Sequence, residues 1–271
     1  MATVAVGSDN GSLVELYYED RGAGRPVVLI HGLLQDCRSG ERQVAALLAA
    51  GYRVISYDRR GFGRSSRPVD GYDFDTLASD LDALLAHLGL TDVVLMGFSL
   101  GTGEVARFLA SHGSGRVSKA VMVGAIPPFL LGGVPGRVFF HMKKSITEDR
   151  DVFITAFLNN AYNFDVLAGI RITEREWQAS RVIAAGASDY VTSACIDVGL
   201  TDFRADIPAI GVPTLVVHGT ADRILPIGAT ARLLPDLNAN VTVVEVDGAP
   251  HGLAWTHPAE VNRAILAFLE N

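Results

Sequence analysis

The sequence predicts an α/β protein with a mostly parallel sheet that is covered by helices on both faces. Short β-branched runs alternate along the chain with segments in which apolar residues recur at helical spacing. The chain has 271 residues, of which 49% are hydrophobic, so it is long enough and apolar enough to bury a large core. Disordered and collagen-like classes are thereby excluded.

The first expected element is an antiparallel hairpin. Two short strand-like runs, Thr3 to Val6 and Leu13 to Glu19, flank the sequence Asp-Asn-Gly-Ser at 9–12. Asn-Gly suits a two-residue turn in which both residues have a positive φ. We therefore expect this hairpin to lead into the sheet.

The rest of the sheet is expected from six apolar runs. They lie at 27–30, 54–57, 93–96, 120–123, 215–217 and 241–246. Together with the hairpin they predict an eight-stranded sheet. The segments with helical periodicity between them are 41–50, 75–87, 100–111 and 258–269.

The alternation of strands and helices stops in the middle of the chain. From about Pro127 to Asp197 the sequence is rich in aromatic residues within mostly helical surroundings. We therefore divide the chain into a first part of the α/β core (1–126), a helical cap (127–197) and a second part of the core (198–271).

Charge and cysteine content exclude several classes of protein. The net charge is −7 and basic residues form no runs, so we expect neither a nucleic-acid partner nor a membrane partner. Two cysteines without paired ligand spacing predict neither a disulfide framework nor a structural metal. The N-terminus has no export pattern, so we expect a cytoplasmic protein. Whether the chain forms a homo-oligomer stays open.

The pentapeptide Gly-Phe-Ser-Leu-Gly at 97–101 follows a predicted buried strand and precedes a predicted helix. This is the context of a nucleophile elbow, in which the serine stands exposed on a strained turn. Gly97 and Gly101 have a physical reason to be glycine, because larger side chains would collide with the crossing strand and helix. Ser99 is therefore the candidate nucleophile, against the alternative of a glycine-rich turn with an incidental serine.

A serine nucleophile needs a base that a third group orients. Asp222 follows the strand at 215–217, and His251 lies in a glycine-rich loop after the strand at 241–246. The chain order of serine, acid and histidine is the one expected for this type of elbow. We assign Asp222 as the acid and His251 as the base. The rival acids that we weighed are Asp202, Asp206 and Asp247.

The developing oxyanion needs hydrogen-bond donors that are already in place. We expect them to be the backbone N–H groups of Leu100, at the start of a helix, and of Leu33, which follows His31 and Gly32. His31 is expected to shape this loop by hydrogen bonds, and His218 to be a satisfied core histidine.

These residues resemble those of the α/β-hydrolases and, within them, of the cofactor-free bacterial haloperoxidases, or perhydrolases, and related arylesterases. The resemblance covers nearly the whole chain and is weakest across residues 132–198. The stretches that carry it are Tyr-Tyr-Glu-Asp at 17–20, residues 26–32, Tyr-Asp-Arg-Arg-Gly-Phe-Gly at 57–63, residues 97–107, Pro-Pro-Phe at 127–129, residues 201–208, residues 218–223 and residues 248–257.

The resemblance implies an α/β-hydrolase fold and an acyl-enzyme on Ser99, supported by His251 and Asp222. In such enzymes hydrogen peroxide can replace water in attacking the acyl group, which gives a peracid that oxidises halide in solution. The resemblance therefore implies no haem, metal or other cofactor, and a small-molecule ester or acyl substrate.

The loop after Gly32 departs from the haloperoxidase pattern. The site usually held by proline carries Leu34, and the site usually held by tryptophan carries Gly40. Because that proline is associated with favouring peroxide over water, Leu34 favours plain ester hydrolysis. The loss of two ring side chains predicts acyl groups bulkier than acetate. The residues expected to line the acyl or alcohol pocket are Leu34, Phe98, Phe129 and Trp255, with Phe157 or Tyr162 from the cap.

The leading hypothesis is a serine-dependent carboxylic ester hydrolase with perhydrolase side activity. Two alternatives remain. One is a specialised acyl-transfer enzyme, lactonase or thioesterase, and the other is a ligand-binding protein on the same fold. Epoxide hydrolases are disfavoured because their nucleophile is an aspartate. Cys37 and Cys195 are expected to be buried and inert.

Overall fold

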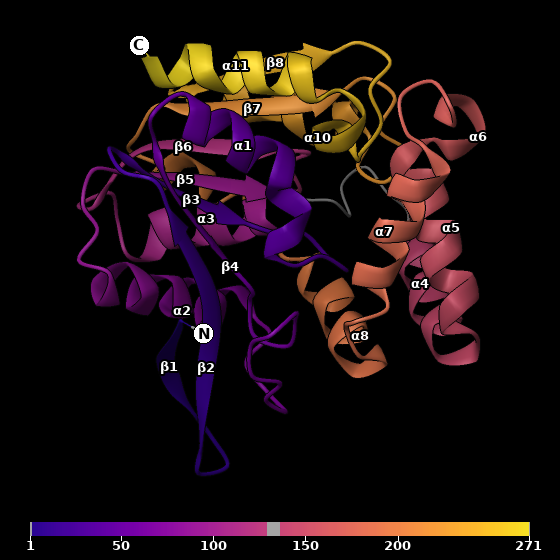
Figure 1. The fold of residues 1–271 in the computed structure, drawn as a ribbon, viewed down its shortest axis with the longest axis horizontal. Helices are drawn as coiled ribbons and strands as arrows, with labels where there is room; N and C mark the ends of the chain where they lie inside the picture. The colour runs from indigo at the N-terminus through magenta and orange to yellow at the C-terminus, as the bar shows by residue number, and fades with distance from the viewer. Residues whose placement is uncertain (1, 129–135, 271) are drawn as a thin grey trace.

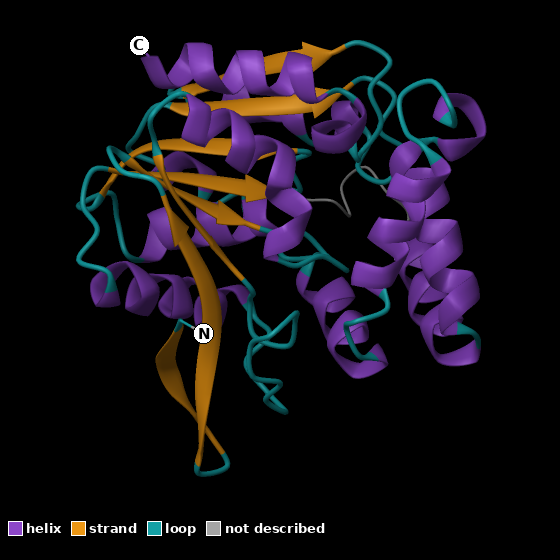
Figure 2. Ribbon diagram, viewed as in Figure 1, coloured by secondary structure: helices purple, strands orange, loops and turns teal. Residues whose placement is uncertain are grey.

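The eight strands of the described residues form one twisted sheet (Figures 1 and 2), as the sequence predicts. The computed structural model describes residues 2–128 and 136–270. The strand order is β1-β2-β4-β3-β5-β6-β7-β8. The strands are β1 (Thr3–Asp9), β2 (Ser12–Arg21), β3 (Pro26–Ile30), β4 (Arg53–Tyr57), β5 (Val93–Phe98), β6 (Val117–Val123), β7 (Thr214–Gly219) and β8 (Val241–Val246).

Strand direction places one set of loops at a common edge of the sheet. β1 and β2 form the predicted antiparallel hairpin, with positive φ at Asn10 (48°) and Gly11 (79°). β2 also pairs antiparallel with β4, whereas the pairs from β4 through β8 are parallel. The loops that follow β3, β5, β7 and β8 therefore meet at the carboxyl edge, where α/β sheets hold their sites.

Helices cover both faces of the sheet (Figure 1). In β3, Val27 and Leu29 belong to the cluster that contains α1 and α11 residues, whereas Val28 and Ile30 belong to the cluster with α2 and α3 residues. Because both faces are buried, the strand is apolar throughout. The core helices are α1 (Glu41–Ala49), α2 (Phe74–His87), α3 (Leu100–Ser111), α9 (Leu234–Leu237), α10 (Leu253–Thr256) and α11 (Pro258–Glu270).

The described residues between β6 and β7 form helices at the carboxyl ends of the parallel strands (Figure 2). They are α4 (Gly136–Glu148), α5 (Arg150–Tyr162), α6 (Phe164–Leu167), α7 (Glu174–Ala184) and α8 (Asp189–Val198). Buried residues of this group, such as Phe153 and Leu158, pack in the same cluster as Leu100 and Phe203 of the core. The division of the chain at 127 and 197 stays a prediction. Among the described helices, none combines the length and apolar character needed to cross a membrane.

Candidate active site

Ser99 lies between the end of β5 and the start of α3, in a strained backbone conformation. Its φ of 52° and ψ of −117° are rare for a residue other than glycine. A Cβ at Gly97 would lie 2.4 Å from the Gly101 carbonyl oxygen, and one at Gly101 would lie 2.4 Å from the Ile30 carbonyl oxygen. Only glycine fits at both positions, which confirms the predicted reason for the two glycines.

The three side chains that the sequence singled out form one chain of hydrogen bonds. His251 Nε2 lies 2.9 Å from Ser99 Oγ, and His251 Nδ1 lies 2.8 Å from Asp222 Oδ2. All three residues are buried. They follow β5, β8 and β7, so the parallel sheet brings together residues that are far apart in the sequence.

Asp222 is held in a fixed orientation. Its Oδ1 accepts hydrogen bonds from the backbone N–H groups of Ile224 (2.8 Å) and Leu225 (2.7 Å). Burial by itself would raise the pKa of Asp222, but His251 and His218 beside the carboxylate hold that pKa well below its usual range. The carboxylate is therefore ionised at neutral pH and can orient and stabilise a charged His251.

His218 is the buried core histidine that the sequence predicts, and it also contacts the acid. Its Nδ1 accepts from the Ala125 N–H (3.1 Å), so its Nε2 carries the proton and donates to the Leu225 carbonyl (2.8 Å). The same Nε2 lies 3.2 Å from Asp222 Oδ2. This contact is not among the sequence-based expectations, although the four-residue spacing between His218 and Asp222 is a signal for it.

The rival acids have other partners. Asp247 accepts from the Thr220 hydroxyl (3.2 Å), Asp206 pairs with Arg107 (2.7 Å) and Asp202 pairs with Arg204 (2.6 Å). The preference for Asp222 over these residues is therefore supported by geometry.

Hydrogen bonds around Gly32 shape the loop that carries Leu33, as predicted for His31. The Arg59 N–H donates to His31 Nε2 (3.0 Å), so His31 Nδ1 carries the proton and donates to the Gly32 carbonyl (2.8 Å). Burial lowers the pKa of His31 well below its usual value, which keeps the ring neutral. From the other side, Gln35 Oε1 accepts from the Gly32 N–H (2.8 Å).

The backbone N–H groups of Leu33 and Leu100 are available to a ligand. Neither has a hydrogen-bond partner within the part of the chain that the structure describes. Leu100 is the first residue of α3, where N–H groups lack partners inside the helix. Leu33, Ser99 and Leu100 line one cavity, here called the Leu100 cavity, together with Ile126 and Ile224.

A buried charged network lies behind this loop, and the sequence analysis did not foresee it. Arg59 Nη2 donates to the Gly32 carbonyl (3.1 Å), and Arg59 Nη1 lies 3.7 Å from Glu104 Oε2. The Tyr57 hydroxyl donates to the other oxygen of Glu104. Burial raises the pKa of Glu104 to about 7, although Arg59 opposes the shift. No periodicity signals such a group, because charged residues are expected at the surface.

The end of α5 is attached to both loops that carry the acid and the base. The Gly252 N–H, next to His251, donates to the Ala161 carbonyl (2.6 Å). The Asn163 side chain donates to the Ala221 carbonyl, next to Asp222 (2.9 Å). The helices between β6 and β7 therefore help to position the site.

Comparison with known proteins identifies the family of this chain. A model of the alpha/beta hydrolase fold family matches residues 25–258. The chain belongs to the α/β-hydrolase family. A putative non-heme chloroperoxidase from Synechocystis is 50% identical to this hydrolase over the full length of both chains.

Two solved structures share the fold of this α/β-hydrolase over nearly their whole length. A bromoperoxidase from Bacillus anthracis is 41% identical, with a TM-score of 0.95 and coverage of 100% of this chain and 99% of the other. An esterase from Exiguobacterium antarcticum is 28% identical, with a TM-score of 0.92 and full coverage of both chains. The relatives of this hydrolase therefore include both non-heme haloperoxidases and esterases.

The predicted pocket residues of the hydrolase fall in different places. Leu34 and Phe98 line a second cavity at the site, here called the His251 cavity, which contains Ser99 and His251 and also Phe157 and Tyr162 of the cap. Phe129 lies outside the described residues.

Trp255 lines a neighbouring cavity rather than the Leu100 or His251 cavity, so its contact with substrate stays a prediction. Its indole N–H donates to the Ser39 carbonyl (2.9 Å), and the Arg42 guanidinium lies 4.8 Å from its ring centroid. These two contacts fix the ring away from Ser99.

Leu34 has a backbone conformation that proline cannot adopt. Its φ is 58°, whereas the proline ring fixes φ near −65°. A proline at this position would therefore require a different path of the backbone next to Leu33.

Both thiols of this hydrolase are buried. Burial is the largest cause that raises the pKa of Cys37 to about 12 and that of Cys195 to about 11. Both therefore remain protonated thiols at neutral pH, as the sequence analysis expects.

Proposed function

We propose that this α/β-hydrolase cleaves carboxylic esters through an acyl-enzyme on Ser99. The observation that carries the proposal is the continuous chain of hydrogen bonds from Asp222 through His251 to Ser99. The unpaired N–H groups of Leu33 and Leu100 beside the same serine support it, because they are donors that an oxyanion requires.

In the acylation step, His251 Nε2 takes the proton of the Ser99 hydroxyl while Oγ attacks the ester carbonyl carbon. The carbonyl oxygen becomes an oxyanion that accepts hydrogen bonds from Leu33 and Leu100. The bond from that carbon to the alcohol oxygen then breaks, and His251 Nε2 returns its proton to the alcohol oxygen. Asp222 accepts from Nδ1–H throughout and stabilises the charged ring.

Deacylation repeats the sequence with water as the nucleophile. His251 Nε2 takes a proton from water as its oxygen attacks the acyl carbon. The bond from that carbon to Ser99 Oγ breaks, and the proton passes to Oγ, which releases the carboxylic acid. Activity is therefore expected to fall on acidification, because a protonated His251 cannot act as a base.

Perhydrolysis is the second candidate, and the names of the related chloroperoxidase and bromoperoxidase favour it. Hydrogen peroxide would attack the same acyl-enzyme in place of water and would release a peracid. The positive φ of Leu34 favours hydrolysis as the main activity, because the loop does not follow the path that proline would impose.

The test is turnover of p-nitrophenyl esters from acetate to octanoate by the wild type and by Ser99→Ala. Each assay is run with and without hydrogen peroxide and bromide, and nitrophenol release and halogenation are both measured. We expect hydrolysis that depends on Ser99, with little halogenation. Strong halogenation would identify a perhydrolase instead. The same series tests whether acyl groups bulkier than acetate are preferred, which stays a prediction.

The alternatives predict no turnover of these esters. A fluorophosphonate probe then distinguishes them, because it labels an activated serine without requiring a particular substrate. Labelling of Ser99 without turnover would indicate a specialised acyl-transfer enzyme, lactonase or thioesterase. No labelling would indicate a ligand-binding protein.

A further inference from the structure

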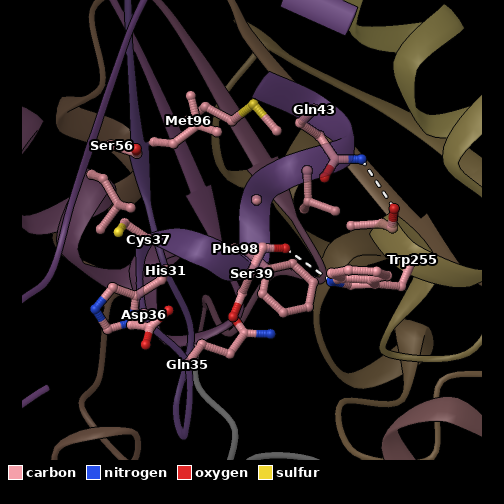
Figure 3. Close-up of a pocket in the computed structure, with 15 residues that line it drawn as sticks. His31, Gln35, Asp36, Cys37, Ser39, Gln43, Ser56, Met96, Phe98 and Trp255 are labelled. Atoms are coloured by element: carbon pink, nitrogen blue, oxygen red, sulfur yellow. Dashed lines mark hydrogen bonds between the residues drawn. The ribbon is translucent and has the colours of Figure 1, made fainter. Parts of the chain in front are cut away.

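A second apolar cavity lies behind Phe98, and the mechanism above does not use it. The cavity is small, with a volume of about 40 Å³. Figure 3 shows Met96 and Ser56 along one side and Phe98 and Trp255 along another. Gly40 also contributes to the lining, so we call this space the Gly40 cavity.

The backbone angles at position 40 do not require glycine, but the lack of a side chain there leaves room in the cavity. Its φ of −91° and ψ of 9° are accessible to residues with side chains. A Cβ there would lie 3.0 Å from Leu29 Cδ2, the far end of a flexible side chain that lines the same cavity. A larger residue would therefore extend toward the cavity and fill part of it. Leaving such a space empty costs stability, because the atoms that line it lose contacts.

Several polar groups around the cavity already have partners, which leaves its interior apolar. Gln43 donates to the Ala254 carbonyl (3.0 Å), and the Trp255 indole donates to the Ser39 carbonyl (2.9 Å), as the dashed lines of Figure 3 show. Gln35 accepts from the Gly32 N–H (2.8 Å). An apolar space of this kind favours an apolar occupant over ordered water.

The Gly40 cavity adjoins the histidine side of the active site. It shares Gln35, Ser39 and Phe98 with the His251 cavity, so the Phe98 ring forms part of the wall between them. The Phe98 ring also lies 5.4 Å from the His251 ring, measured between centroids. The Leu100 cavity, by contrast, is reached from the oxyanion side of Ser99.

This position decides which half of an ester would enter. His251 must give its proton to the alcohol oxygen, so the alcohol half of the ester lies on the His251 side of Ser99. The Phe98 ring is then the part of the wall that separates this half from the Gly40 cavity. The carbonyl oxygen lies at the N–H groups of Leu33 and Leu100.

We propose that the Gly40 cavity is a subsite for the alcohol half of the substrate and that this half is an apolar aryl or branched alkyl group. The proposal rests on the proposed ester hydrolysis. The rings of Phe98 and Trp255 in the lining favour an aromatic occupant, because offset and edge-to-face ring contacts add to the apolar burial. Gly40 and Phe98 are then the residues that determine alcohol specificity.

The test compares acetate esters of methanol, butanol, phenol and 2-naphthol, which all form the same acetyl-enzyme. Gly40→Phe should lower kcat/KM progressively with alcohol size, with a loss for naphthyl acetate at least about tenfold greater than for methyl acetate. Where deacylation limits turnover, kcat should change much less than kcat/KM, because the alcohol has already left. Gly40→Val should give an intermediate loss and serves if the larger variant does not fold.

Gly115→Phe is the matched control, because Gly115 is exposed and a Cβ there meets no atom within 4 Å. It should leave all four esters unchanged. In the p-nitrophenyl series, Gly40→Phe should lower kcat/KM by the same factor for every acyl chain. A loss equal for all alcohols, no loss at all, or a loss that grows with acyl length would overturn the proposal.

A binding measurement separates failure of this proposal from failure of ester hydrolysis. Ser99→Ala should bind 2-naphthol in calorimetry, and adding Gly40→Phe should weaken that binding at least about tenfold. If the wild type hydrolyses no ester, this binding pair still decides the question. Equal naphthol affinity with and without Gly40→Phe, or no binding to Ser99→Ala, would show that the cavity is not an alcohol subsite.

Discussion

Glu104 should make the stability of this hydrolase fall as pH rises from about 4.5 to 7. In the folded protein burial raises the pKa of Glu104 from its usual 4.5 to about 7. Over this interval the folded state holds a proton that the unfolded state has lost. The free energy of unfolding therefore decreases as the pH rises. The pKa difference corresponds to about 3 kcal/mol in total. Above pH 7 both states are ionised and the slope ends.

Glu104→Gln removes this titration while keeping a side chain of nearly the same shape. Glutamine resembles the protonated form of Glu104, so relative to that form the substitution costs a roughly constant amount of stability at all of these pH values. The difference in free energy of unfolding between wild type and variant should therefore shift by about 3 kcal/mol, in favour of the variant, across this pH range.

The assay is urea unfolding followed by circular dichroism at pH 5, 6, 7 and 8. Glu148→Gln is the control, because the Glu148 side chain is 63% exposed and its replacement should leave the pH dependence unchanged. Parallel pH curves for wild type and Glu104→Gln would refute the reasoning, since they would mean that Glu104 titrates alike in the folded and unfolded states.

Three further predictions concern the site itself. Asp222→Asn should lower kcat for p-nitrophenyl acetate by about 10⁴-fold, because an amide no longer holds His251 in the required tautomer; a rate near wild type would exclude Asp222 from the proposed role. Gly97→Ala should destabilise the fold by about 1–3 kcal/mol in urea unfolding, because its Cβ would meet the Gly101 carbonyl oxygen at 2.4 Å, and unchanged stability would contradict the packing described. Leu34→Pro should raise the ratio of perhydrolysis to hydrolysis, measured with and without peroxide, because φ must change from 58° to about −65°; an unchanged ratio would show that this backbone path does not select the nucleophile.

The sequence predicts these strands well because apolar and β-branched runs mark them, both where the strand is buried, as in β3, and where it is partly exposed, as in β8. The run at 241–246 coincides with β8, and the run at 27–30 differs from β3 by one residue. Ser99, Asp222 and His251 are predictable for a related reason. Each follows a recognisable parallel strand, and parallel strands end at a common edge.

Other features depend on how side chains turn in the folded protein, which the sequence pattern does not record. Trp255 is an aromatic residue near the base, yet its bond to the Ser39 carbonyl fixes it beside another cavity. The contact of His218 with Asp222 depends on how the loop after β7 turns back, and the burial of Glu104 arises from packing between distant segments. The positive φ of Leu34 is likewise a property of the loop as a whole.

The most direct test of the central claim is the mass of the protein during turnover. Wild type mixed with p-nitrophenyl acetate and quenched rapidly in acid should carry one acetyl group, and peptide mapping should place it on Ser99. Ser99→Ala should carry none and should release no nitrophenol above background. An acetyl group on another residue, or undiminished nitrophenol release by Ser99→Ala, would contradict the proposed acyl-enzyme.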